Sequence, residues 1–468
     1  MFASVSAVFA RRRGAARFAA TTLVTGLVAA GALAGAGPAA ADETTRSQGG
    51  ATATIAGLKT YGTAVIQGAT GEQQVSAGLF EMSVEGGGTL QTYCVDLHNP
   101  TQRDAKYHET PWSGTSLGVN RDAGRIRWIL QNSYPQVNDL AALARKAGVR
   151  GALTEQDAAA GTQVAIWRYS DDVAVDALDP QAEQLADYLQ KNARALPEPQ
   201  ASLTLDPPAV SGRPGERIGP VTVRTNAGAA TLTPPADAAT TGVRIVDRRG
   251  EEVTSASDGG QVFFEVPEDA VAGSAELTVQ ASTTVPVGRA FASESRSQTQ
   301  ILAGSSESTV SATAGASWAK EGAIPALSAV KNCAEGGVDV TAANKGDEPF
   351  TFDLVGLEHT IAPGETRTIT VPLQEDQAYD FTVHGPGGLT QRFTGLLDCQ
   401  VQGAEPDTST QTLTEPSPAV QGSATDSNLA ETGGSGLTPL IGGIAIGLVV
   451  IGGATLIVLR RRETTAGD

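Results

Sequence analysis

Residues 437–459 form an apolar run of 23 residues that is rich in glycine and contains no charged side chain. As an α-helix, such a run extends about 35 Å, which is enough to cross the hydrocarbon core of a bilayer. Three arginines follow at 460–462, and positive charge beside a span is typical of its cytoplasmic side. We therefore predict a transmembrane helix at 437–459 and a short cytoplasmic tail at 460–468.

The first 41 residues are predicted to be a signal peptide. Three arginines at 11–13 precede an apolar run at about 19–34, and alanines at 39–41 offer a small-residue cleavage site. A membrane anchor is the alternative, but the run is short and its end has the small-residue pattern of a cleavage site. Export would place residues 42–432 outside the cell, where disulfides persist.

The charge of the chain is strongly acidic. It carries 51 acidic and 33 basic residues, for a formal net charge of −18. An acidic surface repels the phosphates of nucleic acids and the anionic face of a membrane. We therefore expect no nucleic-acid partner, and membrane contact only through the C-terminal helix.

The segment at 42–199 is predicted to be a mixed α/β head domain. Alternating strands come first, and three helical patterns follow at about 121–135, 154–170 and 180–196. The second helix begins at a plausible N-cap, Thr154, with an acidic residue three positions on.

From residue 200 the pattern changes to short alternating strands separated by turns rich in proline and glycine. This predicts two all-β domains of the immunoglobulin-like sandwich type, at 200–317 and 318–400. Residues 401–428 have almost no large apolar side chain, so we expect a disordered stalk. It would be either a spacer that spans a thick cell wall or an unstructured linker with no particular length requirement. The whole is a multidomain chain.

Three cysteines occur in the chain: Cys94, Cys333 and Cys399. The last two open and close the final β domain, and free thiols are uncommon outside the cell. We predict that they form a disulfide, which would stabilise the domain by about 4 kcal/mol in the chain-entropy model. Cys94 is then left without a cysteine partner.

The strand predicted at 90–97 has Tyr93, Val95 and Leu97 on one face, which places Cys94 on the other, more polar face. An inert, buried cysteine that packs as a small apolar side chain is the simple alternative.

Gln163 lies on the apolar face of the helix predicted at 154–170, beside Ile166 and Trp167. A buried amide without partners costs about 1–3 kcal/mol. Hydrogen bonds to the backbone are one solution. The other is chemical, because attack of the Cys94 sulfur on the Gln163 amide would release ammonia and leave an internal thioester.

Two short motifs carry these residues: Tyr-Cys-Val-Asp at 93–96 and Thr-Gln-Val-Ala at 162–165. Together they resemble the thioester-forming domain (TQxA type) of Gram-positive surface adhesins, over residues 51–195. The resemblance implies a thioester between Cys94 and Gln163 that captures an amine-bearing surface protein or polysaccharide covalently. Such capture needs no cofactor or metal and has no turnover, so the protein would not be an enzyme. The other motif residues would shape the pocket, orient the bond or relay a proton: Tyr93, Asp96 and Thr162.

Residues 429–433, Leu-Ala-Glu-Thr-Gly, stand just before the apolar run. They resemble a sortase cell-wall sorting signal of the LPXTG-like kind, with Ala430 where proline is usual. The resemblance implies that a sortase cuts between Thr432 and Gly433 and joins Thr432 to peptidoglycan. A secreted protein anchored in the cell wall is therefore expected, and a simple membrane-anchored surface protein is the alternative.

Two rival interpretations of Cys94 remain open. A cysteine-dependent surface hydrolase would need its thiolate beside a histidine base, and His98 and His108 are the histidines of the head. A non-covalent binding module would leave Cys94 inert. The scattered cysteines and histidines lack zinc-ligand spacing, so no metal site is expected.

Overall fold

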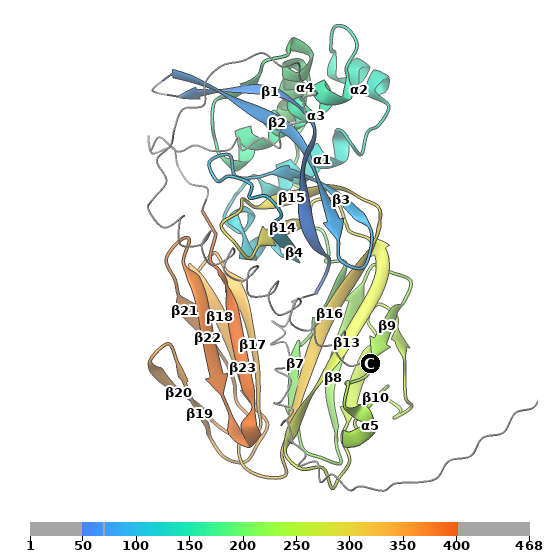
Figure 1. The fold of residues 1–468 in the computed structure, drawn as a ribbon, viewed down its shortest axis with the longest axis vertical. Helices are drawn as coiled ribbons and strands as arrows, with labels where there is room; N and C mark the ends of the chain where they lie inside the picture. Colours follow the sequence, from blue (N-terminus) through green and yellow to red (C-terminus); the bar gives the residue numbers. More distant parts are fainter. Residues whose placement is uncertain (1–48, 69–70, 401–468) are drawn as a thin grey trace, which may run out of the picture. The chain divides into compact units, whose positions relative to one another are not determined.

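The computed structural model describes residues 49–68 and 71–400 (Figure 1). This part is mostly β-structure, arranged in several sheets, with a small group of helices. Within it, no helix combines the length and the apolar character that a membrane span requires. The other predicted segments lie outside the described residues: the signal peptide at 1–41, the stalk at 401–428, the sorting signal at 429–433, the transmembrane helix at 437–459 and the tail at 460–468.

The head contains a sheet of antiparallel strands that closes on itself. Because β1 pairs with both β4 and β2, the strand order returns to its start, and a short seventh strand adds to β1. The order is β2 (Gly71–Val84), β3 (Thr89–Cys94), β15 (Gln300–Ser305), β14 (Ala290–Ser293), β4 (Lys106–Thr110) and β1 (Thr52–Gly68), with β5 (Val175–Ala177) beside β1.

Strand β15 differs from the sequence-based expectation, which placed the strand around residue 300 in the β-sandwich. It pairs with β3 and β14 of the head sheet instead. Both of its faces are covered: Ile301 and Ala303 belong to the core beneath the helices, and Leu302 belongs to a second core, which is shared with the two sheets described below. Local alternation alone could not show this, because the pairing joins segments about 200 residues apart in sequence.

Helix α3 packs on β1 and β2, and the other helices gather around it (Figure 1): α1 and α4 pack on α3, and α2 packs on α4. The predicted capping box of the central helix is confirmed: the Thr154 side chain accepts from the Asp157 N–H, and the Asp157 carboxylate accepts from the Thr154 N–H. The elements are η1 (Trp112–Gly114), η2 (Ser116–Gly118), α1 (Ala123–Asn132), α2 (Leu140–Ala147), α3 (Glu155–Ser170) and α4 (Pro180–Asn192).

Two sheets follow the head in sequence and share one apolar core. Apolar side chains such as Val223, Phe264, Leu277 and Val310 meet between them. The four-stranded sheet has the order β10 (Arg244–Val246), β12 (Gln261–Glu265), β8 (Arg217–Thr225) and β6 (Leu203–Asp206). The five-stranded sheet has the order β11 (Ser255–Ala256), β9 (Ala230–Thr233), β13 (Gly273–Thr284), β16 (Glu307–Trp318) and β7 (Ala209–Gly212), and the short helix α5 (Ala238–Thr241) lies between β9 and β10 in sequence.

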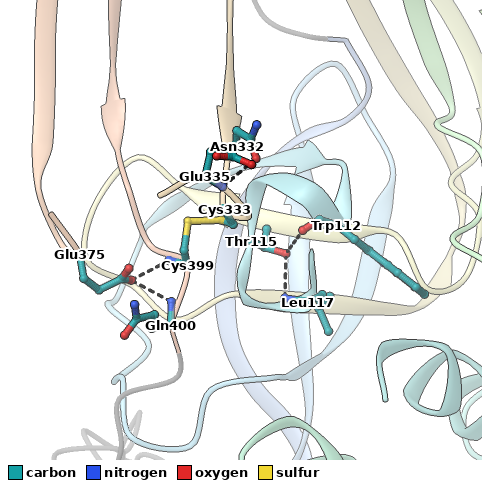
Figure 2. The surroundings of a disulfide bond; sticks show 9 residues. All are labelled: Trp112, Thr115, Leu117, Asn332, Cys333, Glu335, Glu375, Cys399 and Gln400. Carbon is teal, nitrogen blue, oxygen red and sulfur yellow. Dashed lines mark hydrogen bonds between the residues drawn. A yellow bond between two sulfur atoms is a disulfide. The ribbon is translucent and has the colours of Figure 1, made fainter. Parts of the chain in front are cut away.

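The last β unit has its own small core and carries the predicted disulfide. Cys333 and Cys399 are bonded, with 5.2 Å between their Cα atoms, which confirms that pairing (Figure 2). The Cys333 N–H donates to the Ser113 carbonyl oxygen of η1 at 2.9 Å, so this unit contacts the head. Its strands are β17 (Pro325–Asn332), β18 (Gly337–Asn344), β21 (Thr366–Pro372), β19 (Phe350–Leu354), β20 (Leu357–Ile361), β22 (Ala378–His384) and β23 (Thr390–Leu396), with η3 (Pro386–Gly388) before β23.

A buried carboxylate, Glu109, joins segments that are far apart in sequence. It accepts from the Ala51 N–H at 3.2 Å, the Ser202 N–H at 2.9 Å and Arg289 Nε at 2.9 Å. Glu109 and Arg289 are both almost fully buried. Because Arg289 directly precedes β14, this ion pair holds the returning strands β14 and β15 against the head.

Candidate functional site

The central helix α3 places Gln163 inside the head. Small residues allow the close approach that this needs: a Cβ on Gly161 would lie 2.4 Å from the Ala182 carbonyl oxygen of α4. The helix therefore packs tightly on α4 and also on β1 and β2. Gln163 is completely buried as a result.

Gln163 and Cys94, which are 69 residues apart in sequence, are in direct contact. The Cys94 N–H donates to Gln163 Oε1 at 3.0 Å, and Gln163 Nε2 donates to the Cys94 carbonyl oxygen at 2.9 Å. The side-chain amide thus binds the backbone of β3 as a neighbouring strand would. It can do so because β2 pairs with β3 only as far as Thr92, which leaves the Cys94 backbone free on that side.

The environment of the Cys94 sulfur is buried but polar. Cys94 is 2% exposed, and its sulfur accepts a hydrogen bond from Gln300 Nε2 at 3.3 Å. Thr92, on the same face of β3, is also buried and donates to Gln300 Oε1 at 2.9 Å. The alternation predicted that Cys94 faces the more polar side of its strand. The side chains there are polar, but packing of β15 and α3 removes them from solvent.

Burial dominates the acid–base behaviour of this site. It raises the pKa of the Cys94 thiol to about 12, while hydrogen bonding from Gln300 opposes the rise and the nearby Asp96 and Asp171 add to it. Burial also raises the pKa of Asp96 to about 8 and of Asp171 to about 7. Asp171 accepts from the Leu97 N–H at 2.8 Å and thereby holds the segment after β3 against the end of α3.

Two of the predicted pocket residues, Tyr93 and Thr162, make structural hydrogen bonds. The Tyr93 hydroxyl donates to the Tyr134 carbonyl oxygen at 2.9 Å, and the Thr162 hydroxyl donates to the Ala158 carbonyl oxygen within α3 at 2.6 Å. Burial raises the pKa of Tyr93 above its usual range. The third, Asp96, accepts from the His98 N–H at 3.2 Å.

Among the described residues, neither histidine of the head is hydrogen-bonded to the Cys94 sulfur, whose side-chain donor is Gln300. The ring nitrogens of His108 contact Thr52 Oγ1 at 3.0 Å and Glu294 Oε1 at 2.6 Å. His98 is half-buried, and burial lowers its pKa. A hydrolase needs a thiolate of low pKa beside an imidazole. The raised pKa of Cys94 and its amide partner, Gln300, favour a different chemistry.

Sequence reasoning did not identify Gln300 as part of the site. Its strand is separated from Cys94 by more than 200 residues, yet the two residues are directly opposite each other in the β3–β15 pair. The signal that was available is local and weak: a glutamine begins the strand at 300–305, directly before the apolar residues 301–303.

Comparison with known proteins connects this geometry to a family. Residues 91–195 match the family model described as Thioester domain, and residues 322–396 match the one described as Bacterial phospholipase C, C-terminal domain. No curated protein matches the chain. Cys94 and Gln163 both lie in the segment that is similar to the Thioester domain, whereas Gln300 lies outside it.

Solved structures include distant matches. The Bacillus anthracis TIE protein is 16% identical over 74% of this chain and 81% of its own, with a TM-score of 0.26. The thioester domain of the Enterococcus faecium TIE86 protein is 16% identical over 58% of this chain and 97% of its own, with a TM-score of 0.26. The E. coli chaperone DraB is 12% identical over 42% of this chain and 97% of its own, with a TM-score of 0.16. At such low scores these likenesses carry no argument about this chain.

Proposed function

We propose that Cys94 and Gln163 form an internal thioester and that the protein is a surface adhesin that captures amines covalently. The observation that carries this proposal is the pair of hydrogen bonds between the Gln163 amide and the Cys94 backbone. These bonds hold the amide beside the residue whose thiol would attack it. Proximity of this kind removes much of the entropic barrier to a reaction between two groups.

Formation of the thioester balances within the chain. The Cys94 sulfur attacks the Gln163 side-chain carbon, a C–S bond forms, the C–N bond breaks, and the thiol proton leaves with the nitrogen as ammonia. The Cys94 N–H, which donates to Gln163 Oε1, is placed to stabilise negative charge on that oxygen as the carbon becomes tetrahedral. The Cys94 carbonyl oxygen orients the nitrogen that departs.

In the capture step the C–S bond breaks and a new C–N bond to the target forms. An amine attacks the Gln163 acyl carbon, the C–S bond breaks, the sulfur takes a proton from the amine, and an amide links the target to Gln163. Because both residues are buried, water has little access to the thioester. The bond formed is stable, so each molecule reacts once and the protein does not act as an enzyme.

The display of this head at the cell surface is part of the proposal. The signal-like N-terminus, the sorting-like segment at 429–433 and the apolar run at 437–459 support export, cleavage by a sortase between Thr432 and Gly433, and attachment of Thr432 to peptidoglycan. The disulfide between Cys333 and Cys399 fits an oxidising, extracellular location. The target would be an amine of a surface protein or polysaccharide.

Intact mass tests the chemistry directly. The secreted protein should be lighter by one ammonia than its sequence requires, beyond the hydrogens lost to the disulfide, and it should gain one methylamine on incubation. Cys94→Ala and Gln163→Glu should each abolish both changes while the protein stays folded, and Gln163→Glu should expose one free thiol after denaturation. A wild-type protein of full mass that ignores methylamine would overturn the proposal.

The same experiment separates the alternatives. An inert Cys94 in a non-covalent binding module predicts full mass and one free thiol in the wild type. A cysteine hydrolase predicts full mass together with a loss of turnover in His98→Ala. For the anchor, Thr432→Ala should release the protein from the wall fraction, and unchanged retention in the wall would exclude Thr432 as the point of attachment.

A further inference from the structure

The side chain that contacts the Cys94 sulfur comes from outside the segment that resembles a thioester domain. Gln300 lies on β15, which returns to the head after the sandwich, and the matched segment ends at residue 195. Gln300 is fully buried, and its Nε2 donates to the sulfur at 3.3 Å. The register of β3 and β15 places Gln300 opposite Cys94, so the backbone pairing determines the position of the Gln300 Cα atom relative to Cys94.

The orientation of the Gln300 amide is also fixed. Thr92 Oγ1 donates to Gln300 Oε1 at 2.9 Å, which turns Nε2 toward the sulfur. Thr92 pairs with Leu302 in the same register and is itself completely buried. The order Thr92, Gln300, Cys94 is therefore a short chain of donors that ends at the sulfur.

We propose that Gln300 is a third residue of the thioester site, whose N–H stabilises the negative charge that develops on the Cys94 sulfur. This inference rests on the proposed function. The charge arises twice: when the thiol is deprotonated before it attacks Gln163, and when an amine expels the sulfur from the thioester. A neutral thioester sulfur is a weak acceptor, whereas a thiolate is a strong one, so the bond is stronger in the charged state than in the resting state. Interactions of that kind accelerate a reaction.

The need for such a donor follows from the burial of the site. Nearby charged groups do not supply it, because Asp96 and Asp171 are acidic and oppose a thiolate. Two uncharged side chains lower the pKa of Cys94 by hydrogen bonding, Gln300 first and Thr101 after it. The inference also means that the reactive site is complete only when the strands at 290–305 have returned to the head sheet.

The test compares single substitutions in the complete mature protein. Gln300→Met removes the donor and keeps the length of the side chain, and Thr92→Val keeps Gln300 but releases its orientation. Gln136→Met is the matched control, because the Gln136 amide donates to the Ala303 carbonyl oxygen of the same strand at 2.8 Å and is not bonded to the sulfur. Intact mass gives the fraction that has lost ammonia, and the time course of the methylamine adduct gives the capture rate.

A hydrogen bond to a charged group contributes enough to change a rate about tenfold or more. We therefore expect Gln300→Met to slow capture at least about tenfold and Thr92→Val to slow it less. Thr92→Ser keeps the hydroxyl and should capture at close to the wild-type rate. Gln136→Met should leave the rate unchanged. Capture by Gln300→Met at the wild-type rate would overturn the inference while the proposed function stands. A wild type without ammonia loss would overturn the proposed function and this inference with it.

A second measurement does not depend on a thioester. In Gln163→Glu the thiol stays free, and at a fixed pH below its pKa the rate of its alkylation is proportional to the fraction of thiolate. Adding Gln300→Met should lower that rate about tenfold or more, because the thiolate loses its donor. This readout stays informative if Gln300→Met forms no thioester at all, and an unchanged rate in the double variant would contradict the role given to Gln300.

Discussion

Raising the pH from 5 to 7 is expected to destabilise the head, because a buried carboxyl group near Cys94 is protonated in the folded chain. Asp96 is 2% exposed, and burial raises its pKa to about 8, with the facing carboxyl groups of Asp171 and Asp398 adding to the rise. In the unfolded chain the same group ionises near pH 4. Between these two pKa values the unfolded chain binds fewer protons than the folded chain, so the free energy of unfolding falls as the pH rises.

The magnitude follows from the width of this window. A carboxyl group that is protonated in the folded state and ionised in the unfolded state changes the free energy of unfolding by about 1.4 kcal/mol per pH unit. From pH 5 to pH 7 the contribution of Asp96 is therefore a loss of about 3 kcal/mol. Asp171, whose pKa is raised to about 7, adds a smaller change of the same sign because it begins to ionise in the folded chain within this pH range.

The assay is urea unfolding followed by tryptophan fluorescence at pH 5, 6, 7 and 8. Asp96→Asn removes the ionisable group and keeps an oxygen for the His98 N–H. Its free energy of unfolding should fall less steeply than that of the wild type, by about 1.4 kcal/mol per pH unit. Asp172→Asn is the control, since Asp172 is exposed and its positive φ of 54° is tolerated by asparagine.

The net charge of −18 also makes the free energy of unfolding larger at lower pH, because repulsion among the acidic groups is then weaker. This effect is common to all variants, so comparing them at each pH removes it. Equal slopes in the wild type and Asp96→Asn would show that Asp96 is ionised in the folded protein, and the reasoning from burial would then be wrong.

Three further outcomes are expected. Glu109→Gln should destabilise the protein by about 1–3 kcal/mol in urea unfolding, because the buried guanidinium of Arg289 loses one of its two charged partners and keeps the other, Glu198; a change below the error of the measurement would refute this. Replacement of Cys333 and Cys399 by serine should destabilise the last β unit by about 4 kcal/mol while the ammonia-loss mass of the head persists. A chain cut after residue 199 should fail to show that ammonia loss, because β14 and β15 are missing from its sheet, and a truncated chain with normal methylamine capture would contradict this.

Several local features could be predicted from the sequence because short-range physics determines them. The start of α3 at Thr154 follows from a capping box, in which two neighbouring residues satisfy each other's backbone N–H groups. The disulfide between Cys333 and Cys399 could be predicted because the two cysteines stand at the start and the end of one β unit in a chain with a predicted export signal. The contact between Cys94 and Gln163 was anticipated from two motifs and from a glutamine on an apolar helical face.

The composition of the head sheet could not be predicted in this way. The strand at 300–305 has the same local pattern as the sandwich strands around it, so its place beside β3 depends on pairing across about 200 residues. The buried ion pair of Glu109 and Arg289 is of the same kind, since its partners lie 180 residues apart. In both cases the choice depends on which distant surfaces can cover each other.

Sequence alone thus determined the two residues proposed to react, the helix cap and the disulfide, and it predicted the export and anchoring signals, because each is a chemical pattern within a short segment or a pairing of scarce residue types. Only the tertiary structure decided that β15 returns to the head and brings Gln300 to the Cys94 sulfur. The physical reason is that burial of both faces of β15 between two cores selects one pairing partner, and that selection is a property of the packed chain rather than of any segment.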